Sequence, residues 1–525
     1  MKGFKSGMKS FKINLSLSVV LMLTALSFIT MAIQGNVLPL TFSRNVVIYG
    51  CTFIILAVWL ILILLHSLGK VKLTEEKAVF AIIFSAMLLH CCYVLLSGLY
   101  ERQHDEGVYT GIATSQINPG HIGYIEYIYK FHKLPDMNPY QLFSYYHPPL
   151  HYAISAIWLI VLTSFGMPED LAFENLQILP LFYSGLFMLI TYLILKKIGS
   201  KGRGLYVGLM LAAFHPALTI MSGSINNDML STLLLACCIL SALCFIREKS
   251  LKNMILIALS IAFGMLCKIN TAVIALPVGL IFLLDFISVV RTGEKKAIVS
   301  NIKNYILFGI ISATIGLSWI VRNFILFHEK PGIASATETS VMYTGDYGLW
   351  ARLGIPSFAD WHFEFPFHPL SGDVIHNIWV IMFQTSLFAE EYPETLTGFP
   401  LLLCRIVYVT AIITAICSMV IFIITQYKKY RESVWESKLE SVFLITGYMT
   451  FVSAFAAFSL KYPYTCSSDF RYIVICLVFI AVGLSDSTKE VLHNKLFNIL
   501  SKTVRITVCV TMILSTIIYM TWNQW

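Results

Sequence analysis

Charged residues are scarce in this sequence. Asp, Glu, Lys and Arg make up only 13% of its 525 residues, whereas 57% of the residues are hydrophobic. With a mean hydropathy of +0.75, the chain cannot keep its apolar surface from water by folding into soluble domains. The scarcity of charge therefore excludes an ordinary soluble enzyme and predicts a polytopic membrane protein.

The sequence also lacks the paired CxxC spacing of zinc and redox sites, although it has 12 cysteines. Most of them lie inside apolar segments, so we interpret them as small buried hydrophobic residues. No heptad, solenoid repeat or low-complexity linker is present. The net charge of +8 comes from short clusters of Lys and Arg between apolar runs, which indicate membrane topology and no nucleic-acid partner.

What the sequence does have is many apolar runs of roughly 17 to 25 residues, each long enough to cross a bilayer as a helix. The first, at 13–33, lacks a clear cleavage site, so we expect an uncleaved helix. Placing the basic loops in the cytoplasm gives about thirteen spans. The predicted fold class is an all-α integral membrane protein, with residues 1–525 as one polytopic domain and interfacial helices on the outer face.

One apolar run conflicts with this topology. If 149–165 crossed the membrane, the basic loop at 196–204 would lie on the wrong side. This run is short and begins after two prolines, so we expect a helix in the outer interface. The first large outer loop, with interfacial helices, is then 100–165, and a second outer loop is 328–397.

An acidic pair stands at the start of the first outer loop, in "LYERQHDEGVYT" (99–110). If the loop turned Asp105 and Glu106 toward one reactant, one carboxylate could take a proton from an acceptor while the other held the acceptor or a metal ion. A solvated pair at a helix end is the usual alternative for such residues. The pair is the candidate catalytic group.

Three cations lie at outer helix ends, where the positive-inside rule does not favour them: Lys268, Arg322 and Arg471. A charge at membrane depth costs a few kcal/mol and usually has a partner. The side chains could extend to lipid phosphates, or they could converge on the phosphate of a bound ligand. They are the candidate phosphate-binding residues.

Further polar residues collect on the same side. The motif "SYYHPPLHY" (144–152) offers Tyr146 and His147 as substrate contacts, with a capped interfacial histidine as the alternative. The motif "INND" (225–228) starts a span, where we expect Asn226 to cap the helix and Asn227 and Asp228 to contact substrate or a cation. The aromatic loop 360–379 suits stacking on sugars, and equally an interfacial aromatic belt.

The combination of "DE", "HPPL", "NND", a Lys between two short spans and a late "RY" resembles the GT-C glycosyltransferases of the protein-O-mannosyltransferase and aminoarabinose-transferase type. The likeness covers 100–330, and the last third only through its hydrophobic pattern and "DFRY". It implies inverting transfer of a sugar from a polyprenyl-phosphate donor to an acceptor at the outer membrane face. Asp105 would be the base, Glu106 would support acceptor binding, and Lys268, Arg322 and Arg471 would hold the phosphate.

Other properties follow from this resemblance. The chain would lie in the plasma membrane, among membrane lipids, with its active site outside. The acceptor stays open between a protein, a lipid and a glycan. No cofactor is certain, although a divalent metal ion could bind the acidic pair.

Two other functions are alternatives to a glycosyltransferase. A transporter or flippase for a lipid-linked saccharide would also have many spans and charged residues in the membrane, but those charges usually lie at the midplane between two related halves. A noncatalytic partner in a cell-wall assembly complex would tolerate loss of Asp105.

Overall fold

The structure, a computed structural model, describes most of the chain as helix. The described residues are 14–37, scattered positions in 46–61, 74–99, 120–330, 342–368, 376–390, Pro393, 395–432, 434–486 and 495–521. Over these residues the only β-type pairing is an isolated bridge between Tyr343 and Tyr464. The predicted second span, 46–66, falls mostly outside the described residues.

Nine helical segments in the described part of the chain are long and apolar enough to cross a membrane. They are α1 (Leu15–Gln34), α3 (Glu75–Leu96), the segment Glu169–Lys197 that ends with α7 (Ile178–Lys197), α10 (Asp228–Arg247), the segment Ile269–Thr292 that contains α12 (Ala275–Thr292), α13 (Lys295–Gly316), α17 (Gly398–Arg431), α18 (Trp435–Lys461) and α20 (Lys495–Thr521). These helices confirm the predicted class, an all-α, multi-pass membrane protein.

Shorter helices and turns connect them. The helices are α4 (His121–Phe131), α5 (Leu150–Ser164), α6 (Glu169–Glu174), α8 (Gly202–Ala213), α9 (Pro216–Met221), α11 (Leu251–Cys267), α14 (Ser318–Phe327), α15 (Leu349–Leu353), α16 (Ile378–Phe388) and α19 (Cys476–Asp486). The 3₁₀ turns are η2 (Pro139–Gln141), η3 (Asn175–Gln177), η4 (Ile269–Ile274), η5 (Ala359–Trp361), η6 (Thr465–Ser468) and η7 (Phe470–Tyr472).

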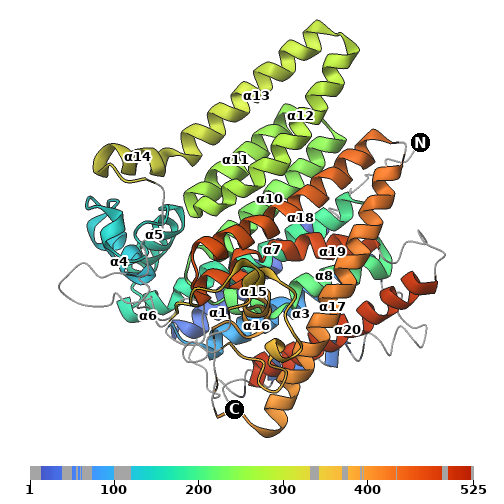
Figure 1. Ribbon diagram of the computed structural model, residues 1–525. Helices are drawn as coiled ribbons and strands as arrows, with labels where there is room; N and C mark the ends of the chain where they lie inside the picture. The colour runs from blue at the N-terminus through green and yellow to red at the C-terminus, as the bar shows by residue number, and fades with distance from the viewer. Residues whose placement is uncertain are drawn as a thin grey trace, which may run out of the picture.

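The short helices gather at one end of the long ones. Figure 1 shows α4, α5, α6 and α14 together on the left, whereas the turn between α12 and α13 lies at the opposite end, at the top. The run predicted to lie in the outer interface is α5, a helix of 15 residues that packs against α4. At 1.5 Å per residue it spans about 22 Å, which is short for a hydrocarbon core of about 30 Å.

The helices pack closely where small residues face a neighbour. A Cβ atom on Gly208 of α8 would lie 2.6 Å from the carbonyl oxygen of Ala481 in α19. Only glycine allows the two backbones to approach this closely, as in other membrane helix pairs. In contrast, the one buried residue of α13 is Gly316, and apolar side chains such as Val299 and Ile306 are exposed, as expected for a helix with one face toward lipid.

Buried acids at the other end of the helices pair with the basic residues that the topology assigns to the cytoplasm. The carboxylate of Glu440, near the start of α18, accepts hydrogen bonds from Arg247 at 2.5 Å and from Lys429 at 2.6 Å. Asp285 pairs with Lys249 in the same way. A carboxylate in an apolar environment is costly unless it is paired, so these contacts join the ends of α10, α17 and α18.

We expect Glu440→Gln to destabilise the fold by about 2 kcal/mol, because Arg247 and Lys429 would each lose their charged partner. Thermal unfolding of the purified protein in detergent measures the change. Glu432→Gln, at an exposed position directly after the end of α17, is the control and should leave Tm unchanged. Equal Tm values for the two variants would contradict a structural role for Glu440.

Candidate functional site

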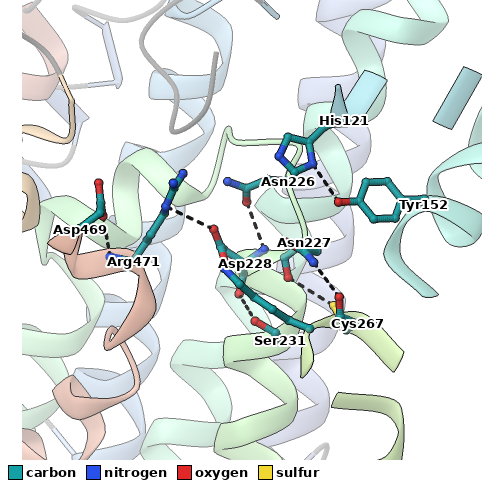
Figure 2. Close-up of polar contacts among 10 residues, drawn as sticks. His121, Tyr152, Asn226, Asn227, Asp228, Ser231, Cys267, Asp469 and Arg471 are labelled. Carbon is teal, nitrogen blue, oxygen red and sulfur yellow. Dashed lines mark hydrogen bonds and ion pairs between the residues drawn. The ribbon is translucent and has the colours of Figure 1, made fainter. Parts of the chain in front are cut away.

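A buried cluster of three charged residues lies where α10 begins. The carboxylate of Asp228 pairs with the ammonium group of Lys268, and its second oxygen lies 3.9 Å from Nε of Arg471. All three side chains are almost fully buried, with 3%, 10% and 5% of their surface exposed. Figure 2 shows Asp228 and Arg471 facing each other from different segments. We call these three residues the Asp228 cluster.

Local hydrogen bonds fix the backbone around Asp228. The side-chain oxygen of Asn226 accepts a hydrogen bond of 3.1 Å from the amide of Asp228, the first residue of α10, although the N-cap position itself is Asn227 and not, as predicted, Asn226. The carboxamide of Asn227 donates to the carbonyl of Cys267 at 2.7 Å. This bond joins the start of α10 to the end of α11, and it thereby brings Lys268 beside Asp228.

Arg471 is positioned by a separate turn. In η7, the carboxylate of Asp469 accepts a hydrogen bond of 2.7 Å from the amide of Arg471. The amide of Phe470 donates to the hydroxyl of Thr385 on α16 at 3.0 Å. The late "DFRY" motif is therefore a short turn, held by its own aspartate and by α16, that carries Arg471 to the start of α10.

The charges of the site are balanced and shielded. The two formal negative charges of Asp228 and Asp469 cancel the two formal positive charges of Lys268 and Arg471. The ring of Tyr472 lies against both cations, 4.5 Å from Nζ of Lys268 and 5.3 Å from the guanidinium carbon of Arg471. Two cations share the single carboxylate of Asp228, so both can also offer hydrogen bonds to a second, bound anion.

A group of aromatic and imidazole rings forms the neighbouring wall. His121, the first residue of α4, is hydrogen-bonded through Nδ1 to the hydroxyl of Tyr152 at 2.8 Å. The ring of His147 stacks on His121 with ring centroids 5.6 Å apart. The ring of Tyr146 packs at a tilt against His147, with ring centroids 4.5 Å apart. Figure 2 shows His121 and Tyr152 in the same close-up as the start of α10. The predicted residues Tyr146 and His147 therefore belong to this wall.

One glutamine joins three parts of the site. The buried carboxamide of Gln177 donates to the carbonyls of Ser97 and Gly223, at 3.3 and 3.2 Å, and accepts from Gln34 at 2.7 Å. Gly223 lies in the segment that leads into Asn226, and Ser97 caps the end of α3. Gln177 therefore holds the end of α3 against that segment.

Arg322, the third predicted phosphate-binding cation, is held by partners outside the Asp228 cluster. Its guanidinium donates to the carbonyl of Pro135, and it also bonds Asn323 and lies over the ring of Trp319. The indole of Trp319 in turn donates to the carbonyl of Tyr146 at 3.2 Å. Arg322 thus fastens α14 to the segment before α5, and the cations at the start of α10 are Lys268 and Arg471.

Asp105 and Glu106 lie outside the described residues, so their predicted catalytic role remains a prediction. Among the described residues there is no group of three or more His, Cys, Asp or Glu side chains arranged to hold a metal ion. A divalent ion at the acidic pair likewise stays a prediction.

Part of the aromatic loop at 360–379 is committed to packing. Trp361 and Phe363 contact Tyr408 on α17, and Phe367 contacts Phe388 on α16 with centroids 4.6 Å apart. These rings anchor the loop on two helices. The structure thus gives them a packing role, whereas the sequence pattern had left sugar stacking and an interfacial belt open.

Sequence reasoning missed several residues of the site. Tyr152 lies in the quoted "HPPLHY" motif and Asp469 in "DFRY", so both had a local signal. His121 and Gln177 had none, because each is a single polar residue in an otherwise ordinary segment.

Residues 147–319 match the family described as dolichyl-phosphate-mannose-protein mannosyltransferase. The matched segment contains His147, the residues 226–228 and Lys268, whereas Arg471 lies beyond it. A search of curated proteins found no match. The family match confirms the predicted resemblance to GT-C glycosyltransferases of the protein-O-mannosyltransferase type over this segment.

Two solved structures resemble the chain distantly. The Archaeoglobus fulgidus oligosaccharyltransferase in its apo form is 12% identical, with a TM-score of 0.45 over 85% of this chain. The chain spans only 56% of that protein's length. ArnT from Cupriavidus metallidurans bound to undecaprenyl phosphate is also 12% identical, with a TM-score of 0.36 over 79% of this chain and 78% of that one.

We expect Asp228 and Lys268 to be strongly coupled in stability, by about 2 kcal/mol in a double-mutant cycle. Asp228→Asn and Lys268→Met should each destabilise the protein, because each leaves a buried charge without its partner. The double variant should lose less than the sum, as measured by thermal unfolding in detergent.

The matched control is the exposed pair of Lys133 and Asp136, for which the equivalent cycle should show no measurable coupling. Additive effects of Asp228→Asn and Lys268→Met would contradict the predicted coupling.

Proposed function

We propose that this chain is a glycosyltransferase that moves a sugar from a polyprenyl-phosphate carrier to an acceptor at the outer face of the plasma membrane. The observation that carries this proposal is the buried Asp228 cluster, two of whose three residues lie in the segment that matches the dolichyl-phosphate-mannose-protein mannosyltransferase family. The family's donor, as its description states, is a sugar on a lipid phosphate. Two cations that share one carboxylate suit such a phosphate.

Binding of the donor would add a second anion beside the same two cations. In the proposed complex, the phosphodiester oxygens take hydrogen bonds from Lys268 and Arg471, which keep their contacts with the Asp228 carboxylate. The planar guanidinium of Arg471 can donate two parallel hydrogen bonds to a phosphate, and the ammonium group of Lys268 adds a compact positive charge. As the leaving group departs, its negative charge grows, and cations already in place stabilise that charge without reorganisation.

The transfer itself needs one base. In the proposed step, the acceptor oxygen or nitrogen attacks the anomeric carbon from the face opposite the phosphate, and its proton passes to Asp105. The bond between the anomeric carbon and the phosphate oxygen breaks, which releases polyprenyl phosphate and inverts the anomeric centre. Glu106 would orient the acceptor, alone or together with a divalent metal ion.

The remaining predicted contacts would hold the substrates. His147 and Tyr146 belong to the ring wall beside His121, where stacked rings suit a sugar face. Asn227 has its amide group committed to Cys267, so we assign its carbonyl oxygen to the substrate. The membrane spans supply an apolar environment for the prenyl chain, and the acceptor is a protein, a lipid or a glycan.

We expect Asp105→Asn to abolish transfer while leaving the protein folded, because the amide cannot accept the acceptor's proton. The assay measures label moved from radiolabelled polyprenyl-phosphate mannose and related donors into membrane products, at matched expression. Asp170→Asn, at an exposed position on α6, is the control and should keep wild-type activity. Movement of an intact lipid-linked saccharide across the membrane without transfer would instead establish the transporter alternative.

Lys268→Ala should raise KM for the lipid-phosphate donor about tenfold to a hundredfold, the effect expected for one lost hydrogen bond to a charged group. KM for the acceptor should stay close to its wild-type value. Arg322→Ala should instead lower Tm with little effect on donor KM, since Arg322 fastens α14 to a loop. If Arg322→Ala raised donor KM as much as Lys268→Ala, the assignment of the two cations would be wrong.

A further inference from the structure

His151, at the start of α5, has no role in the function proposed above. Its ring is only 1% exposed, and its Nε2 atom lies 2.7 Å from the carbonyl oxygen of Ile225. Ile225 directly precedes Asn226, whose side-chain oxygen accepts a hydrogen bond from the amide of Asp228. The ring of Tyr152, which is hydrogen-bonded to His121, packs edge-on against the ring of His151, with the ring centroids 5.4 Å apart. His151 therefore lies between the ring wall and the segment that holds Asp228.

The contact with Ile225 fixes which nitrogen of His151 carries the proton. A carbonyl oxygen can only accept a hydrogen bond, so Nε2 must be the donor. Burial lowers the pKa of His151 to about 4, so the ring is neutral at neutral pH and has a single proton. Nδ1 must then carry a free lone pair, which makes it an acceptor.

This acceptor has no donor within the part of the chain that the structure describes. Nδ1 of His151 is a buried polar atom without a hydrogen-bond partner. A buried polar atom without a partner destabilises the fold. The nearby hydroxyl of Tyr152 is engaged with His121, so the neighbouring side chain does not satisfy it.

We propose that Nδ1 of His151 accepts a hydrogen bond from a hydroxyl group of the bound substrate, either on the donor sugar or on the acceptor. This inference rests on the proposed glycosyltransferase function and adds to it a recognition residue specific for a hydroxyl. The geometry suits the task because the bond to Ile225 holds the ring at a fixed angle beside the Asp228 cluster. His151 would bind substrate and take no part in proton transfer.

Two substitutions separate this role from a purely structural one. His151→Gln places an amide NH near the position of Nε2 and keeps the bond to Ile225, but it removes the acceptor at Nδ1. His151→Asn offers a carbonyl oxygen near the position of Nδ1 but loses the bond to Ile225. If His151 recognises substrate, His151→Gln should weaken substrate binding and His151→Asn should lower stability. If His151 is purely structural, His151→Gln should change neither substrate binding nor stability.

The experiment measures Tm in detergent, and KM for donor and acceptor separately, using polyprenyl-phosphate mannose and the acceptor found with the wild-type protein. We expect His151→Gln to keep Tm but to raise one KM about tenfold, the fold-change that corresponds to one neutral hydrogen bond. A raised donor KM identifies a sugar hydroxyl, and a raised acceptor KM an acceptor hydroxyl. His151→Asn should lower Tm and leave both KM values closer to wild type.

An active wild-type protein whose KM values are unchanged by His151→Gln would overturn this inference and leave the proposed function standing. A wild-type protein that transfers sugar from no lipid-phosphate donor would overturn both. Because the decisive variant is expected to keep its fold, the result does not depend on whether His151→Asn can be purified.

Discussion

The ion contacts of Asp228 with Lys268 and Arg471 are the constraint on which the rest of the site depends. A carboxylate buried at the end of a membrane helix is tolerated only with cationic partners. Here the partners are Lys268, at the end of α11, and Arg471, in η7. Satisfying this one group therefore fixes where three distant parts of the sequence meet. The bonds of Asn226, Asn227 and Asp469 hold the backbones at that meeting point.

The fold class and the start of the span near Asn226 could be predicted from the sequence because both follow from local rules. Long apolar runs must be helices in a bilayer, and polar residues before a span bond its first amides, although the exact cap position was missed by one residue. The identity of the cations could not be predicted in the same way. Lys268 and Arg322 look equivalent in sequence, but only tertiary packing decides that Lys268 meets Asp228 while Arg322 fastens α14. For the same reason His121 and Gln177 gave no signal.

The short helices α5 and α14 contact segments of the site and do not pack only against one another. Arg322 and Trp319 of α14 hold the segment that ends in Tyr146, and His151 of α5 holds the segment before Asn226. Gln177 holds the end of α3 to that same segment. The polar groups that would meet a substrate are thus carried by short elements whose positions depend on a few specific hydrogen bonds to backbone carbonyls.

The helix α10 has a buried ion contact at each of its two ends. Asp228, its first residue, belongs to the Asp228 cluster, and Arg247, its last, pairs with Glu440 at the opposite end. A shift of α10 along its axis would break both contacts at once, so these contacts fix the position of the helix. Under the proposed function, any movement that admits a lipid-linked substrate would then come from the shorter elements, such as α4, α5 and α14, while α10 stays in place.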